Sequence, residues 1–143
     1  MRIMGLDYGS KTVGVALSDE LLLTAQGYSI IRRDSEKKLR KTLAEIAQIA
    51  ADNGVTEIVL GYPKNMDGSE GDRCKKTREF QSLVEKRTGL PVTLWDERLT
   101  TVAADRAMDE AGLRREEKKE HVDRIAAEFI LRGFLDARAG KNT

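Results

Sequence analysis

The stretch IMGLDYGSKTVGVAL, residues 3–17, decides the fold. Two short apolar runs, Ile3–Leu6 and Thr12–Leu17, are separated by turn-forming residues, and Leu21–Arg32 is a third extended stretch. Short β-type runs divided by turn residues are typical of strands joined by tight connections. We therefore expect the chain to open with an antiparallel meander of three strands, in which Gly27 marks a bulge or a close approach of another element.

Beyond this meander, the apolar residues alternate between helical and strand spacing. We expect a helix capped by Asp34 or Ser35 and ending at Gly54, followed by a strand at Glu57–Leu60. A second helix is expected at Asp72–Arg87, with Phe80, Leu83 and Val84 inward, and then a strand at Pro91–Trp95. The chain is then expected to form a helix from Thr100 or Thr101 to Gly112, a solvated charged loop at Leu113–Glu120 and a last helix at Glu120–Ala137. Strands that alternate with helices imply parallel crossovers. The predicted fold class is α/β, a mixed five-stranded sheet flanked by helices. We expect one domain over residues 1–138 and a flexible tail over residues 139–143.

The composition favours a cytoplasmic globular protein. The chain has 143 residues, of which 40% are hydrophobic and 34% charged. Its one cysteine, Cys74, cannot form an internal disulfide, which favours a reducing compartment. No run approaches the roughly 20 apolar residues that span a bilayer. Because 25 Lys and Arg oppose 24 Asp and Glu, any binding of nucleic acid needs a local basic patch.

Three acidic residues occupy positions that each allow two interpretations. Asp7 ends an apolar strand and is either a turn residue or a metal ligand. Glu97 follows the strand that ends at Trp95; it is either part of a polar connection or a site residue, and strand alternation puts Asp96 and Glu97 on opposite faces. Asp123 precedes an apolar helical stripe and is either a solvated acid favoured by the helix dipole or a third site residue.

Together, these acids favour one site, because strand ends and a covering helix can bring distant carboxylates together. Hard oxygen ligands without a cluster of His or Cys favour Mg²⁺ or Mn²⁺ over zinc. One or two such ions held by carboxylates suit the hydrolysis of phosphodiester bonds.

Four blocks of sequence resemble, in order, the bacterial pre-16S rRNA nuclease family, which is also described as a family of Holliday junction resolvases. They are the opening hairpin GLDYGSK with GVALSD (residues 5–11 and 14–19), the glycine loop GYPKNMDGSEG (61–71), the motif WDERLTT (95–101) and the helix motif VDRIAA (122–127). The resemblance covers Arg2 to about Leu135. It implies an RNase H-like fold and assigns Asp7, Glu97 and Asp123 to the catalytic, metal-binding acids. It also implies maturation of the 5′ end of the 16S rRNA precursor, and hence a role in ribosome biogenesis.

Five residues near these motifs are candidates for phosphate contacts: Lys11, Lys64, Asn65, Arg73 and Arg98. The expected partners are nucleic acid (precursor rRNA, branched DNA or single-stranded DNA) and ribosomal assembly particles, with the protein a monomer or weak homodimer.

Three other functions compete with the processing of precursor rRNA. Within the nuclease class, the alternative is resolution of branched DNA. Outside it, the alternatives are a nucleotide-binding ATPase or sugar-kinase-like domain and a non-catalytic module that binds RNA or the ribosome.

Overall fold

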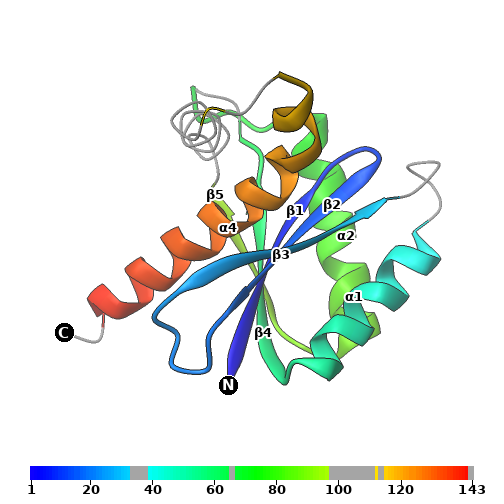
Figure 1. Ribbon diagram of the computed structural model, residues 1–143. Helices are drawn as coiled ribbons and strands as arrows, with labels where there is room; N and C mark the ends of the chain where they lie inside the picture. Colours follow the sequence, from blue (N-terminus) through cyan, green and yellow to red (C-terminus); the bar gives the residue numbers. More distant parts are fainter. Residues whose placement is uncertain (33–38, 65–66, 97–111, 113–114, 142–143) are drawn as a thin grey trace.

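The computed structural model describes residues 1–32, 39–64, 67–96, 112 and 115–141, and the side chains of the last helix from Arg124 to Ala139. Five strands form one sheet in the order β3-β2-β1-β4-β5 (Figure 1). The described elements are β1 (Arg2–Tyr8), β2 (Thr12–Ser18), β3 (Ala25–Arg32), α1 (Arg40–Asp52), β4 (Val55–Tyr62), α2 (Asp72–Thr88), β5 (Val92–Asp96) and α4 (Arg115–Lys141). None of the helices in these ranges has the length and apolar character needed to cross a membrane.

The strand pairing confirms the predicted meander and crossovers. β1 pairs antiparallel with β2, and β2 pairs antiparallel with β3. β4 and β5 then add in parallel beside β1, each reached through a helix. The carboxyl ends of β1, β4 and β5 consequently lie at one edge of the sheet.

Alternation along β1 divides its side chains between two cores. Met4, Leu6 and Tyr8 belong to the core beneath α1 and α2, whereas Ile3 belongs to the core beneath α4. Because side chains alternate along a strand, Asp7 shares the α4 face with Ile3. Figure 1 shows α4 crossing one side of the sheet, with α1 and α2 on the other.

Two glycines lie where residues of α4 come closest to their strands, Gly5 against the helix itself and Gly27 against the Arg124 side chain. A Cβ at Gly5 would come within 2.8 Å of the Leu131 Cβ and 3.0 Å of the Ala127 carbonyl oxygen. A Cβ at Gly27 would come within 2.7 Å of Arg124 Cγ, and the β2–β3 register shifts opposite this glycine, between Val15 and Ala16. Both expectations for Gly27, the close approach and the bulge, are confirmed.

Several predicted local features are wrong. α1 begins at Arg40 with Leu39 as its N-cap rather than Asp34 or Ser35, both of which lie outside the described residues. Leu83 is 38% exposed, because it lies at the margin of the α2 face that packs inward. The charged stretch expected as a loop is helical from Arg115 onwards, because its Arg, Glu and Lys residues are good helix formers.

The strands and helices are also longer or shorter than predicted at their ends. β1 continues through Tyr8, so that Asp7 is the last residue but one of the strand rather than its end. β3 begins only at Ala25, because residues 19–24 form the turn of the hairpin. α4 extends to Lys141, beyond its predicted end at Ala137. The predicted helix between Thr100 and Gly112 falls almost wholly outside the described residues.

Candidate active site

Asp7, the first of the three candidate acids, lies at the carboxyl edge of the sheet. It is half-buried, pairs with Gly14 across the β1–β2 ladder, and lies on the face covered by α4. The parallel ladder between β1 and β4 ends one residue earlier, at Leu6–Leu60. A carboxylate that is half-buried on a mostly apolar face carries a desolvation cost unless a cation or hydrogen-bond donors compensate it.

The backbone of Asp123 lies in α4, one helical turn before Ala127. Ala127 is fully buried, and its carbonyl oxygen would lie 3.0 Å from a Cβ at Gly5. Gly5 lies two residues before Asp7, on the same face of β1. The helical turn that carries Asp123 therefore adjoins the part of α4 seated on β1. Nothing is described of the Asp123 side chain itself.

Glu97 follows β5 directly and lies outside the described residues. The two residues before it are described. Trp95 packs in the core beneath α4, and its indole lies at right angles to the Phe134 ring with centroids 5.8 Å apart. Asp96 pairs with Tyr62 of β4 and is exposed on the other face of the strand.

Thus, of the three predicted carboxylates, only that of Asp7 belongs to the described side chains. Among those side chains, no three acids, histidines or cysteines lie close enough together to hold a metal ion. The hard oxygen of Asp7, at the end of a strand and half-buried, has the chemistry that Mg²⁺ or Mn²⁺ prefers.

On the opposite face, Arg73 of α2 supports the end of β1. Its Nη2 donates a hydrogen bond of 2.9 Å to the Tyr8 carbonyl oxygen. Its guanidinium carbon also lies 5.2 Å from the centroid of the Tyr8 ring, which in turn stacks on Phe80 at 4.0 Å. The residue after Asp7 is therefore held by a cation, a hydrogen bond and an aromatic stack.

The glycine loop between β4 and α2 is fastened at its end by a three-residue network. Tyr62 Oη donates to Glu70 Oε1 at 2.7 Å, and Arg78 Nη1 donates to Tyr62 Oη at 3.0 Å and to Glu70 Oε2 at 3.3 Å. Burial and the hydrogen bond with Glu70 raise the pKa of Tyr62 to about 12. The same hydrogen bond lowers the pKa of Glu70. This network cannot be predicted from the sequence, because nothing in the spacing pairs a strand-end tyrosine with residues 8 and 16 positions later.

The remaining candidates for phosphate contacts lie at the same edge or outside the described residues. Lys11 is exposed in the β1–β2 turn, and Lys64 is half-buried just after β4, where its backbone N–H donates to the Tyr62 carbonyl. Asn65 and Arg98 lie outside the described residues. In the described part of the chain, Lys11, Lys64 and Arg73 thus all lie next to the carboxyl ends of β1 and β4.

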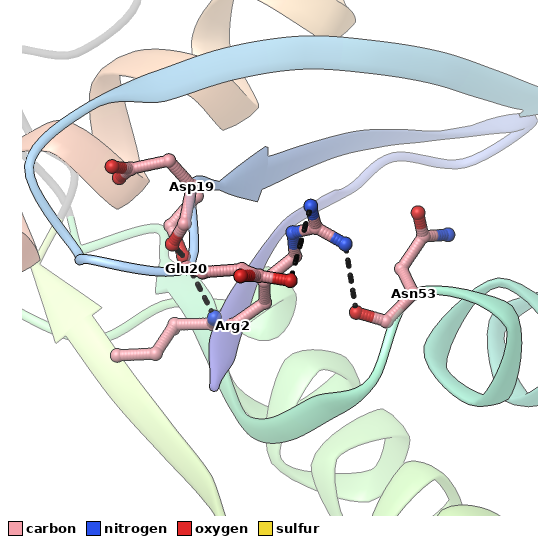
Figure 2. Close-up of polar contacts among 6 residues, drawn as sticks. Arg2, Asp19, Glu20 and Asn53 are labelled. Atoms are coloured by element: carbon pink, nitrogen blue, oxygen red, sulfur yellow. Dashed lines mark hydrogen bonds and ion pairs between the residues drawn. The ribbon is translucent and has the colours of Figure 1, made fainter.

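A second polar cluster lies at the opposite end of the sheet. Figure 2 shows Arg2 between Glu20, at 3.9 Å, and the backbone carbonyl of Asn53, at 3.2 Å. Nearby, Asp19 Oδ1 accepts hydrogen bonds from the backbone N–H groups of Leu23 and Thr24. The hydrogen bond from Thr24 is the main cause that lowers the pKa of Asp19. These contacts hold the β2–β3 turn in place beside a cavity of about 280 Å³.

Comparison with known proteins extends these observations. A family model described as "RuvX: Holliday junction resolvase" matches residues 1–137. A "Putative pre-16S rRNA nuclease" of Agathobacter rectalis is 66% identical over 136 residues, which are 95% of each chain. A relative with the same name from Lachnospira eligens is 58% identical, and the match covers 96% of this chain and 99% of the relative. Another, from Myxococcus xanthus, is 50% identical, and the match covers 100% of this chain and 93% of the relative.

Solved structures share the fold at low sequence identity. RuvC of T. thermophilus in complex with a Holliday junction substrate has a TM-score of 0.59 and 14% identity, with 98% of this chain and 97% of RuvC covered. The fowlpox virus Holliday junction resolvase has the same TM-score and identity, with 96% and 99% covered. These neighbours confirm the predicted RNase H-like architecture. The family match and the near-full-length relatives lead to one conclusion: the chain belongs to the RuvX family.

Proposed function

We propose that this protein is a metal-dependent nuclease that hydrolyses phosphodiester bonds, with Asp7, Glu97 and Asp123 as its catalytic carboxylates. The observation that carries the proposal is the position of Asp7, half-buried at the carboxyl end of the central strand and on the face where α4 packs. Glu97 comes directly after a parallel strand of the same sheet, and Asp123 lies one turn before Ala127, whose carbonyl oxygen lies against Gly5 of β1.

The same three carboxylates are the groups that would hold one or two Mg²⁺ or Mn²⁺ ions. When bound, such ions activate a water molecule and stabilise the leaving oxygen of the phosphodiester. The contribution of the chain is to orient the carboxylates and to reduce access of bulk water. Gly5 serves this end, since only a residue without a Cβ lets α4 lie so close to the strand that carries Asp7.

Basic residues at this edge would bind the phosphates on either side of the cleaved bond. We assign this role to Lys11 in the β1–β2 turn and Lys64 in the glycine loop, together with Asn65 and Arg98. The chain has a net charge of only +1, so these local contacts, rather than a general positive field, would attract nucleic acid. Binding should accordingly weaken as salt is raised.

The proposed substrate is the 5′ region of the 16S rRNA precursor, acted on in the cytoplasm during ribosome biogenesis. Support comes from the curated relatives, which carry the name of pre-16S rRNA nucleases and extend over nearly the same length. The second candidate is resolution of a Holliday junction. It is favoured by the description of the family and by the likeness to two junction resolvases.

A direct test compares cleavage of a labelled 16S precursor and of a four-way DNA junction in Mg²⁺, Mn²⁺ or EDTA. Wild type and Asp7→Asn are run side by side. We expect metal-dependent cleavage of the precursor RNA, lost in the variant. Cleavage of the junction alone would select resolution of branched DNA. Equal processing of the RNA by both proteins would reject the catalytic role of Asp7. Failure of both folded proteins to cleave either substrate would favour a non-catalytic RNA-binding module.

A further inference from the structure

Arg73 was predicted from the sequence to contact phosphate, but its surroundings indicate a different role. It is half-buried in the first turn of α2, not extended into solvent. Its guanidinium lies over the ring of Tyr8, whose side chain belongs to the core beneath α1 and α2. Asp7 lies on the opposite face of β1, beneath α4. Arg73 therefore sits on the face of the strand away from the candidate site.

What Arg73 does reach is the peptide group that follows Asp7. Its Nη2 donates to the Tyr8 carbonyl oxygen at 2.9 Å, and Tyr8 lies beyond the last pair of the β1–β4 ladder, Leu6–Leu60. On the other side, the ladder with β2 continues to Tyr8, and the Gly9 N–H donates to the Thr12 carbonyl at 2.8 Å. Arg73 thus extends the support of β1 on its β4 side by two residues, at the point where Asp7 is held.

The identity of the residue matters, because the two contacts need different properties. A position over the face of an aromatic ring suits the guanidinium of arginine, which can at the same time donate an N–H group to the carbonyl. The partner ring is itself fixed, since Tyr8 and Phe80 stack with an angle of 4° between their planes. A lysine could keep the charge but would lack the flat guanidinium and its several N–H donors.

We propose that Arg73 is a positioning residue that fixes the carboxyl end of β1, and through it the Asp7 carboxylate, without binding substrate. The proposal rests on the nuclease function proposed above. Arg78, the other arginine in the first two turns of α2, supplies a similar contact elsewhere: it fastens Glu70 and Tyr62 at the end of the glycine loop. In the described residues, α2 thus contacts both the end of β1, through Arg73, and the end of the glycine loop, through Arg78.

The test uses Arg73→Met, Arg73→Lys and the control Lys75→Met, an exposed cation two residues away. Four quantities are measured: kcat on the cleaved substrate, Mn²⁺ affinity by calorimetry, nucleic-acid affinity by anisotropy in EDTA, and the slope of that affinity with salt. For Arg73→Met we expect Mn²⁺ binding about tenfold weaker and kcat roughly 10- to 100-fold lower. Nucleic-acid affinity and salt slope should stay within about twofold of wild type, because one phosphate contact fewer would lower the slope by about one.

Arg73→Lys keeps the charge, folds with less disturbance, and should recover part of kcat and Mn²⁺ affinity. The backbone ¹⁵N shift of Gly9, the residue bonded to the Tyr8 carbonyl, should move in both Arg73 variants and not in Lys75→Met. The Gly9 shift can be measured without metal or substrate, so it tests the contact between Arg73 and Tyr8 directly. If the wild type cleaves nothing, the proposed nuclease function fails, but the contact is still tested. The inference is overturned if either Arg73 variant keeps wild-type Mn²⁺ affinity and Gly9 shift, or if it loses nucleic-acid affinity together with one unit of salt slope.

Discussion

The seating of α4 on β1 leads to a prediction about a single methyl group. In Gly5→Ala, the added Cβ would lie 2.8 Å from the Leu131 Cβ and 3.0 Å from the Ala127 carbonyl oxygen. Ordinary van der Waals contact begins at 3.4 Å, so α4 must retreat by about 0.6 Å, the difference between 3.4 and 2.8 Å. Neither neighbour can rotate away, because one is a backbone atom and the other is the first atom of a fully buried side chain.

Overpacking of this kind costs about 1–3 kcal/mol of the free energy of unfolding. For a domain of this size, that corresponds to a fall in Tm of about 3 °C per kcal/mol, measurable by circular dichroism. The shift also moves the turn that carries Asp123 away from Asp7. Because a misplacement of about 1 Å can cost 10²-fold in rate, we expect roughly a tenfold loss of kcat in the folded variant.

Gly27→Ala is the matched control. Its Cβ would meet an even shorter contact, 2.7 Å, but the neighbour is Cγ of Arg124, a long side chain that can change rotamer. Alanine also restricts the unfolded chain more than glycine does, which offsets part of the cost. We expect a change in stability within about 1 kcal/mol and an unchanged kcat. If Gly5→Ala matches Gly27→Ala in both Tm and kcat, the close seating of α4 is not what shapes the site.

Three further predictions concern the contacts that hold the site and sheet together. Folding lowers the pKa of Glu70, so the Glu70 carboxylate stabilises the protein at pH values above the unfolded pKa. This stabilisation is lost as the pH falls through the lower folded pKa. Glu70→Gln should therefore flatten the acid limb of a curve of unfolding free energy against pH. The pKa of Tyr62 is raised to about 12, so stability should decline as the pH rises from 10 towards 12, and a Tyr62→Phe variant with the same decline would refute this. Phe80 is 1% exposed and stacks on Tyr8, so Phe80→Ala should cost about 3–5 kcal/mol in denaturant unfolding, whereas a loss below about 1 kcal/mol would contradict its place in the core.

Much of the fold was predictable because strand and helix periodicities are local properties of the sequence. Gly27 was recognised as a bulge or close approach because a glycine inside an apolar strand has few other uses. The start of α1 could not be predicted in this way. Asp34 and Ser35 are residue types that cap helices well, but whether they do so depends on where the preceding strand ends. Leu83 was assigned inward on period alone, although only tertiary packing decides which margin of a helix is covered.

The candidate site divides in the same way. Asp7 was found because a carboxylate in an apolar strand conflicts with its surroundings. The role of Arg73 could not be inferred, because its contact with Tyr8 joins residues 65 positions apart. The link between Tyr62, Glu70 and Arg78 is closer in sequence, but it depends on how the glycine loop returns to α2.

The most direct test of the proposed site is the affinity for Mn²⁺ of four single variants, measured by calorimetry on folded protein. These are Asp7→Asn, Glu97→Gln, Asp123→Asn and Asp96→Asn, the last being a neighbouring acid exposed on the face of β5 opposite Trp95. We predict that each of the first three weakens binding at least about tenfold, because each replaces a charged carboxylate ligand with a neutral amide, and that Asp96→Asn binds as wild type does. Wild-type affinity in Asp7→Asn, or a loss confined to Asp96→Asn, would contradict the assignment of the three carboxylates.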